Sequence, residues 1–181
     1  MTATTRIAFY LGRRNEIPNS KIGDWGICHV TKSRFSHVEL LSSITSADVV
    51  VEGQIHKKII ATMYSSSLRD KGVRGVTKQL YTDRWVIVEI SGDSKPAIQY
   101  IINKIGTKYG LLDLAGFLLP IDIDTVGEFC SEITTNGLNN AKFNDLPVAN
   151  KTAPEHLFLW AKKQPGFRIV PAGELHRDWV A

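Results

Sequence analysis

The chain of 181 residues is poor in cysteine and in long apolar runs. Its 2 cysteines, Cys28 and Cys130, are too few for the disulfide framework of a small secreted protein. One Cys28–Cys130 bridge is conceivable, but we expect free thiols in a reducing compartment. No segment approaches the roughly 20 apolar residues of a membrane span. Asp113 and Pro120 interrupt the longest apolar stretch, "GLLDLAGFLLPI".

The chain also lacks a cluster of charge of one sign, because its charged residues are scattered. There are 22 Lys and Arg residues against 18 Asp and Glu, a net charge of +4, and no dense basic run of the kind that binds nucleic acid. The first residues, "MTATTRIAFYLGRRNE", lack the basic region and long apolar stretch of a secretory signal. We therefore expect a cytoplasmic protein with no nucleic-acid partner and no transmembrane segment.

What is present is an ordinary globular composition, 43% hydrophobic and 22% charged, without repeats or low-complexity segments. A chain of this length fits one domain over residues 1–181. Residues 13–33 are rich in turn formers and charges and predict a long loop. The first half otherwise predicts strands with a hairpin split at Gly53 and a turn at 69–76; the expected strands are 6–12, 36–41, 47–55, 57–65 and 84–91.

Helical patterns fill the second half of the chain. The expected helices run from Ser94 to Gly106, over 109–119, over about 128–140, and over "PEHLFLWAKK", for which Thr152 and Glu155 form a capping box. The tail adds one short strand. Because strands and helices are segregated along the chain, we expect an α+β fold, with an antiparallel sheet covered on one side by helices.

Cys130, in "GEFCSEITTNGLNN", is the first candidate for chemistry. A thiol attacks as the thiolate, and a helix N-terminus and a nearby imidazolium both favour that form. The pattern predicts that Cys130 lies in the first turn of its helix, where its own N–H can help to bind an oxyanion. A small buried filler is the structural alternative for the same residue.

A base for this thiol must come from one of 5 histidines. His37 is the first choice, because it opens an apolar strand, "HVELL", and a strand fixes a side chain better than a loop does. The others have less suitable places: His29 in a loop beside Cys28, His56 in a hairpin turn, His156 in the first turn of a helix and His176 near the end of the chain.

Such a base is usually oriented by a third polar group. Glu39 is two residues from His37 and therefore on the same face of its strand. Glu52 ends "VVVE", which could lie on the neighbouring strand. The choice depends on the strand register: pairing along "VVVEG" favours Glu52, whereas pairing along "MYSSS" favours Glu39, with Tyr64 or Ser65 opposite.

These motifs carry a family resemblance. "SHVEL" early and "FCSEI" late resemble the circularly permuted branch of the NlpC-type papain-like hydrolases, in which the histidine strand precedes the cysteine helix. "KYGLLDLAGF" (108–117) resembles the segment before that helix, and "RIAFYLG", "YSSSLRDKGVRG" and "RWVIVEI" resemble small proteins of tailed bacteriophages. The resemblance covers residues 6–140. It implies a papain-like fold with Cys130 as nucleophile and His37 as base.

One residue departs from the family pattern. Many members have a small residue, usually glycine, two positions after the histidine, where this chain has Glu39. The resemblance implies hydrolysis of an amide or isopeptide, with a peptide, a peptidoglycan fragment or another acyl compound as substrate. It implies a location in the host cytoplasm, or in the virion, and no cofactor.

Other classes of function were weighed against a thiol hydrolase. The Gln-Ala-Cys signature of caspase-like proteases is absent. Cys28 and His29 are adjacent but have no partner pair at zinc-site spacing, so no metal is expected. The strongest rival is a papain-like shell that binds a host protein or a lipid without cleaving it. Arg69 and Arg74, in "SSSLRDKGVRG", either form a structural turn or line a site mouth and bind a carboxylate.

Overall fold

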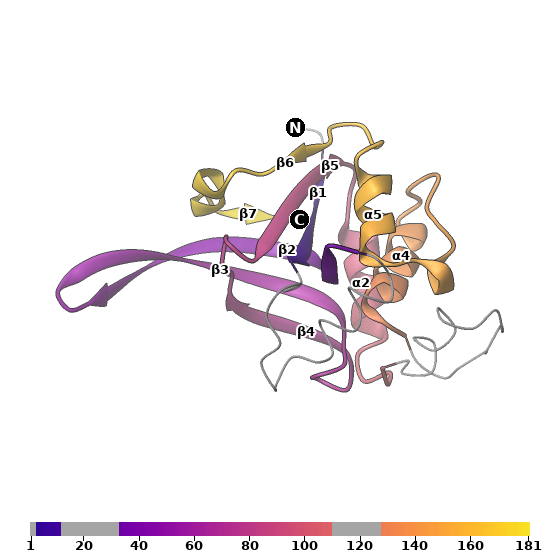
Figure 1. The fold of residues 1–181 in the computed structure, drawn as a ribbon, viewed down its shortest axis with the longest axis horizontal. Helices are drawn as coiled ribbons and strands as arrows, with labels where there is room; N and C mark the ends of the chain where they lie inside the picture. The colour runs from indigo at the N-terminus through magenta and orange to yellow at the C-terminus, as the bar shows by residue number, and fades with distance from the viewer. Residues whose placement is uncertain (1–2, 12–32, 110–127) are drawn as a thin grey trace.

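The computed structural model describes residues 3–11, 33–109 and 128–181. Within these ranges, the chain forms one seven-stranded sheet with three α-helices (Figure 1). The central strand order is β4-β3-β2-β1-β5-β6, with β7 paired to β2, and the strand pairs are antiparallel. The strands are β1 (Thr4–Leu11), β2 (Phe35–Val51), β3 (Gln54–Ser67), β4 (Gly72–Gln79), β5 (Trp85–Ser91), β6 (Arg168–Ile169) and β7 (Trp179–Val180).

The helices lie together on one side of the sheet (Figure 1). They are α2 (Lys95–Asn103), α4 (Cys130–Asn140) and α5 (Pro154–Ala161), with short 3-10 turns η1 (Ala149–Lys151) and η2 (Ala172–His176). Gly137 of α4 lies against the Ala97 carbonyl of α2, where a Cβ would approach the oxygen to 3.1 Å. This small residue lets the two helices pack closely.

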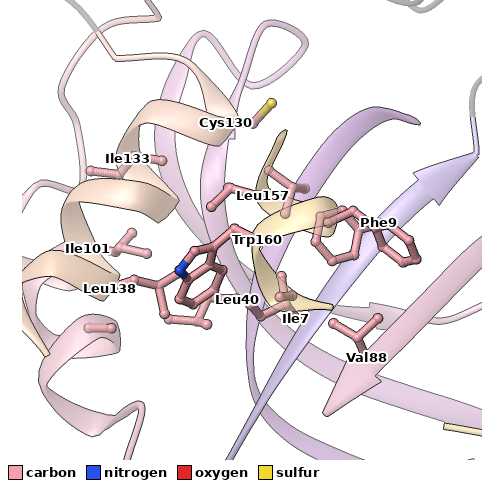
Figure 2. Packing of buried hydrophobic residues seen from close by; sticks show 14 of the residues in the cluster. Ile7, Phe9, Leu40, Val88, Ile101, Cys130, Ile133, Leu138, Leu157 and Trp160 are labelled. Carbon is pink, nitrogen blue, oxygen red and sulfur yellow. The ribbon is translucent and has the colours of Figure 1, made fainter. Parts of the chain in front are cut away.

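Alternation along the strands builds a core on each face of the sheet. Ile7 and Phe9 of β1 face the helices, in a cluster that includes Leu157 and Trp160 of α5 (Figure 2). Ala8, between them, belongs to a second cluster on the other face with Leu175 of the C-terminal segment. The expectation of an α+β fold with an antiparallel sheet and helices on one face is therefore confirmed.

Two local expectations in the strand region were wrong. The runs 36–41 and 47–55 belong largely to one strand, β2, which continues through an irregularity between Leu41 and Ser43. Residues 69–76 are a turn only at the start, since β4 begins at Gly72. Gly72 there allows a close approach, because a Cβ on it would clash with the Thr107 carbonyl oxygen. The glycine at position 72 is therefore explained by close packing of the backbone and not by a turn.

The helix boundaries differ from expectation mainly in their caps. α5 begins at Pro154 after Ala153, whose N–H donates to Nδ1 of His156 at 3.2 Å. Thr152, expected to cap this helix, instead donates its hydroxyl to the Val148 carbonyl at 2.6 Å. The tail forms two short strands, β6 and β7, where one was expected. The helix expected over 109–119 and nearly all of the loop over 13–33 lie outside the described residues.

Candidate active site

Cys130 is the first residue of α4, after Phe129 in extended conformation. The helix begins here because Glu132 turns back to accept the Phe129 N–H at 3.4 Å, which caps the first turn from one side. Buried hydroxyls fix the same turn: Thr134 donates to the Cys130 carbonyl at 2.7 Å, and Ser131 donates to the Thr152 carbonyl. Cys130 therefore has a defined place at the positive end of the helix dipole.

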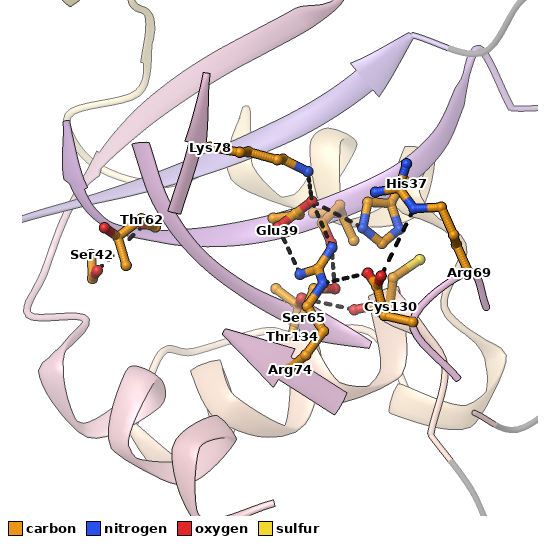
Figure 3. Close-up of polar contacts among 12 residues, drawn as sticks. His37, Glu39, Ser42, Thr62, Ser65, Arg69, Arg74, Lys78, Cys130 and Thr134 are labelled. Carbon is orange, nitrogen blue, oxygen red and sulfur yellow. Dashed lines mark hydrogen bonds and ion pairs between the residues drawn. The ribbon is translucent and has the colours of Figure 1, made fainter. Parts of the chain in front are cut away.

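The Cys130 thiol is free and buried, with 3% of the residue exposed. It belongs to the helix-side cluster, but it lies at the margin of that cluster and its sulfur points away from Ile133 and Leu138 (Figure 2). In Figure 3 the sulfur points toward His37. The buried thiol is thus directed to a polar neighbour at the edge of the core.

His37 and Glu39 lie on β2, on the face opposite the helices. Val38 and Leu40, which alternate with them, are both 0% exposed in the helix-side cluster. Cys130 nevertheless reaches the His37 ring, because β2 begins at Phe35 and His37 lies at the end of the sheet. The first turn of α4 lies beside this end of β2. Because the sheet ends here, a side chain from the helix side can reach a side chain on the opposite face.

The His37 ring bridges Cys130 and Glu39. Its Nε2 lies 3.2 Å from Oε1 of Glu39 (Figure 3), which leaves Nδ1 to interact with the Cys130 thiol. Burial lowers the pKa of His37, but the charge of Cys130 and the hydrogen bonds with Cys130 and Glu39 outweigh it and raise this pKa to about 9. His37 is therefore an imidazolium at neutral pH.

Glu39 is fully buried and accepts hydrogen bonds from two further cations. Arg74 binds both carboxylate oxygens, at 2.9 and 3.1 Å, and Lys78 Nζ lies 3.1 Å from Oε1 (Figure 3). Burial alone raises the pKa of Glu39, but the hydrogen bond and charge of His37, with the charges of Arg74 and Lys78, lower it far below its usual range. The carboxylate is therefore ionised.

Neighbouring residues hold these cations in position. Asp70 accepts a hydrogen bond from Nε of Arg74 at 2.9 Å. Lys78 Nζ lies 5.1 Å from the centre of the Trp85 ring, and the same ring meets His37 edge-on at 6.4 Å. The Lys78 contact is of the kind that favours a cation near the face of an aromatic ring. The site is a connected network on β2, β4 and β5 with Cys130 at one end.

The structure brings together three of the four residues predicted for the site. Cys130, His37 and Glu39 are in contact, whereas Glu52 is in the exposed turn between β2 and β3, with a φ of 51°. The strand separating it from His37 spans roughly 45 Å at about 3.3 Å per residue. Leu40 pairs with Tyr64, so the register follows "MYSSS", and the Glu52 alternative was wrong.

Sequence reasoning missed Lys78 and left the role of Arg74 open. The signal was present, because Arg74, Val76 and Lys78 alternate along one strand and therefore share a face. It could be used only after β4 was known to begin at Gly72 and to pair Arg74 with Ser65.

The remaining candidates lie away from this network. His56 is on the exposed part of β3, His156 caps α5, and His176 ends η2. Cys28 and His29 fall outside the described residues. Across the described ranges, no group of three or more His, Cys, Asp and Glu side chains is placed to hold a metal ion. In the same ranges, no helix has the length and apolar character needed to cross a membrane.

Comparison with known proteins adds no family to this geometry. No protein-family model, no curated protein and no solved structure matches the chain. Functional inference therefore depends on the arrangement of Cys130, His37 and Glu39 and on the resemblance of the motifs that carry them.

Proposed function

We propose that the protein is a thiol hydrolase that cleaves an amide or isopeptide bond through an acyl-enzyme intermediate. One observation carries the proposal: Cys130, at the start of a helix, lies beside His37, and Nε2 of His37 faces the buried carboxylate of Glu39. Nucleophile, base and orienting group are the parts that cysteine hydrolases need. They come here from two separate elements, α4 and β2.

In the first half of the reaction, the Cys130 thiolate attacks the substrate carbonyl carbon and a C–S bond forms. The carbonyl oxygen takes the negative charge, and the N–H of Cys130, in the first turn of α4, is placed to donate to it. His37 gives its Nδ1 proton to the departing amine as the C–N bond breaks. The products of this half are a free amine, a thioester on Cys130 and a neutral imidazole.

In the second half, water cleaves the thioester. The neutral His37 takes a proton from the water, whose oxygen attacks the thioester carbonyl. The C–S bond then breaks, which releases a carboxylic acid and returns the thiolate beside the imidazolium. Glu39 keeps the ring orientation through Nε2 in both halves and stays ionised, because Arg74 and Lys78 neutralise it.

The substrate class follows from the resemblance to permuted NlpC-type hydrolases. Peptidoglycan stem peptides are the first substrates to test, followed by other isopeptides and by lipid esters or amides. Under this proposal the protein is encoded by a bacteriophage and acts from the host cytoplasm or as part of the virion.

The second candidate is a papain-like protein that binds a host component or a lipid without cleaving it. The burial of Cys130, 3% exposed and packed in the helix-side cluster, favours this reading. A nucleophile has to meet its substrate, whereas a structural thiol does not. Thiol reactivity separates the two candidates.

The deciding experiment combines a covalent thiol probe with an assay on peptidoglycan fragments. We expect Cys130 to react with iodoacetamide at pH 6 in the folded protein, and Cys130→Ala to lower hydrolysis by ~10⁴ or more. Thermal unfolding of the variant should remain close to that of the wild type. Full hydrolysis by Cys130→Ala would falsify the proposal, and an inert Cys130 without hydrolysis would support the binding protein.

A further inference from the structure

The turn between β3 and β4 places an arginine at the same end of the sheet as His37. Arg69 is in this turn, which the Lys71 N–H closes onto the Leu68 carbonyl at 3.2 Å. Its side chain is 80% exposed. In Figure 3 its side chain extends from the turn in the direction of His37. The guanidinium is thus directed toward the end of the network where His37 lies.

Among residues 3–11, 33–109 and 128–181, no side chain or carbonyl accepts a hydrogen bond from the Arg69 guanidinium, which leaves its N–H groups for a ligand. Its ion-pair partner among the described residues is Asp70, with Nε and Oδ1 separated by 3.8 Å, which is too long for a hydrogen bond. Asp70 is more tightly bound to Arg74, at 2.9 Å. Because Arg74 already binds this carboxylate, Arg69 is not needed to neutralise it.

Arg34, another exposed cation on this part of the chain, has a different role. Its Nε lies 3.4 Å from Glu155, and its guanidinium stacks on the rings of Phe35 and Phe158 at 4.6 and 4.5 Å. These contacts tie the start of β2 to α5. Arg34 is therefore part of the packing, whereas Arg69 projects from the turn and has one weak contact within the described part of the chain.

We propose that Arg69 binds a carboxylate on the acyl substrate, close to the bond that Cys130 cleaves. A guanidinium presents paired N–H donors that match the two oxygens of a carboxylate. The substrate class is then an acidic peptide or isopeptide rather than a neutral lipid ester. This inference rests on the proposed thiol chemistry, because it places a substrate carboxylate next to the carbonyl that Cys130 attacks.

Alkylation of Cys130 by two reagents tests the inference without an identified substrate. Iodoacetate and iodoacetamide transfer groups of similar size to the thiolate with loss of iodide, but only iodoacetate carries a carboxylate. The rate constant for each is measured at low ionic strength from the mass of the peptide that contains Cys130. The iodoacetate-to-iodoacetamide ratio isolates the attraction for the anion from the reactivity of the thiol.

Arg69→Gln should lower this ratio about two- to threefold, the effect of one exposed unit charge within a Debye length, and added salt should reduce the difference. Arg177→Gln is the matched control, because Arg177 is exposed and also precedes an aspartate, Asp178, which binds the Ser46 N–H far along β2 from His37. Its ratio should equal that of the wild type.

The outcomes distinguish this inference from the proposed function. An unchanged ratio in Arg69→Gln, with normal iodoacetamide reactivity, overturns the carboxylate site and leaves the thiol chemistry standing. A Cys130 that reacts with neither reagent in the folded protein overturns both. A reduced iodoacetate rate with an unchanged iodoacetamide rate in Arg69→Gln supports the site.

Discussion

The two halves of β2 form the same type of strand in opposite surroundings. In the first half, Val38, Leu40 and Leu41 are 0% exposed, and His37 and Glu39 lie among charged partners. In the second half, β2 and β3 extend as a two-stranded arm beyond the rest of the sheet (Figure 1). Val50 there is 69% exposed and pairs with Ile55, which is 71% exposed.

The difference shows that β propensity alone does not place a strand in a core. β7 pairs with Ser43 and Ile44, and β4 reaches Ile60, so the arm beyond them has no third strand among the described residues. A two-stranded ribbon is marginally stable in water by itself. We therefore expect substitutions near Glu39 to affect stability strongly and substitutions in the arm to affect it little.

The largest effect should come from Glu39→Leu. This change leaves Arg74 and Lys78 without their buried carboxylate, which costs about 3–5 kcal/mol in the free energy of unfolding. Urea denaturation measures it. Asp48→Asn is the matched change in the arm, since exposed Asp48 pairs across the ribbon with Lys57, and it should cost less than about 1 kcal/mol. Equal costs for the two variants would contradict the comparison.

The next effect is on the pH dependence of stability. The folded-state pKa of His37, about 9, lies above its ordinary value of 6.5, so the protonated ring stabilises the fold. This contribution is complete below pH 6.5 and is lost as pH rises through about 9. The free energy of unfolding, taken as wild type minus His37→Gln, should fall by about 3 kcal/mol between pH 6 and pH 10. A difference that stays constant over this range would show that the ring is not held as an imidazolium.

A smaller effect is expected from Lys78→Met. Glu39 keeps both hydrogen bonds from Arg74 and its contact with His37, so the loss of one partly exposed hydrogen bond should cost about 1 kcal/mol. Lys57→Met is the arm control and should change the urea midpoint less. A cost for Lys78→Met as large as that of Glu39→Leu would mean that Arg74 does not compensate the carboxylate.

The smallest effect should follow removal of the arm itself. Ser46 and Ile59 face each other in the register, so Asn-Gly can replace residues 47–58 as a two-residue hairpin turn. We expect a change in unfolding free energy within about 0.5 kcal/mol and unaltered alkylation of Cys130 by iodoacetamide. A lower yield of folded protein would indicate that the arm contributes to the stability of the rest of the sheet and its helices.

The sequence predicted the parts of this comparison that depend on local pattern. Alternation predicted β5, and Ser94 with Pro96 predicted the start of α2, because each signal lies within a few residues. Cys130 and His37 could be proposed as a catalytic pair from the sequence, because local pattern marks the start of the helix that carries Cys130 and the start of the strand that carries His37. The papain-like assignment is a proposal based on the motif resemblance, and the catalytic roles are a proposal based on the chemistry of Cys130, His37 and Glu39.

Register was the information that local pattern lacked. Both "VVVEG" and "MYSSS" suit a strand beside "SHVEL", and the choice between Glu39 and Glu52 depended on where the chain turns. The turn at Glu52 and Gly53 decides it, with φ values of 51° and 77°. Lys78 was missed for a related reason, because its distance from Glu39 depends on two successive strand pairings.

The sharing of one Glu39 oxygen has a consequence for turnover. Oε1 faces both His37 and Lys78, at 3.2 and 3.1 Å. When the His37 imidazole gives up its Nδ1 proton during a reaction cycle, the Lys78 ammonium group still donates a hydrogen bond to Oε1. The Glu39 carboxylate therefore keeps its orientation. The ring can then alternate between its charged and neutral forms while its surroundings stay still.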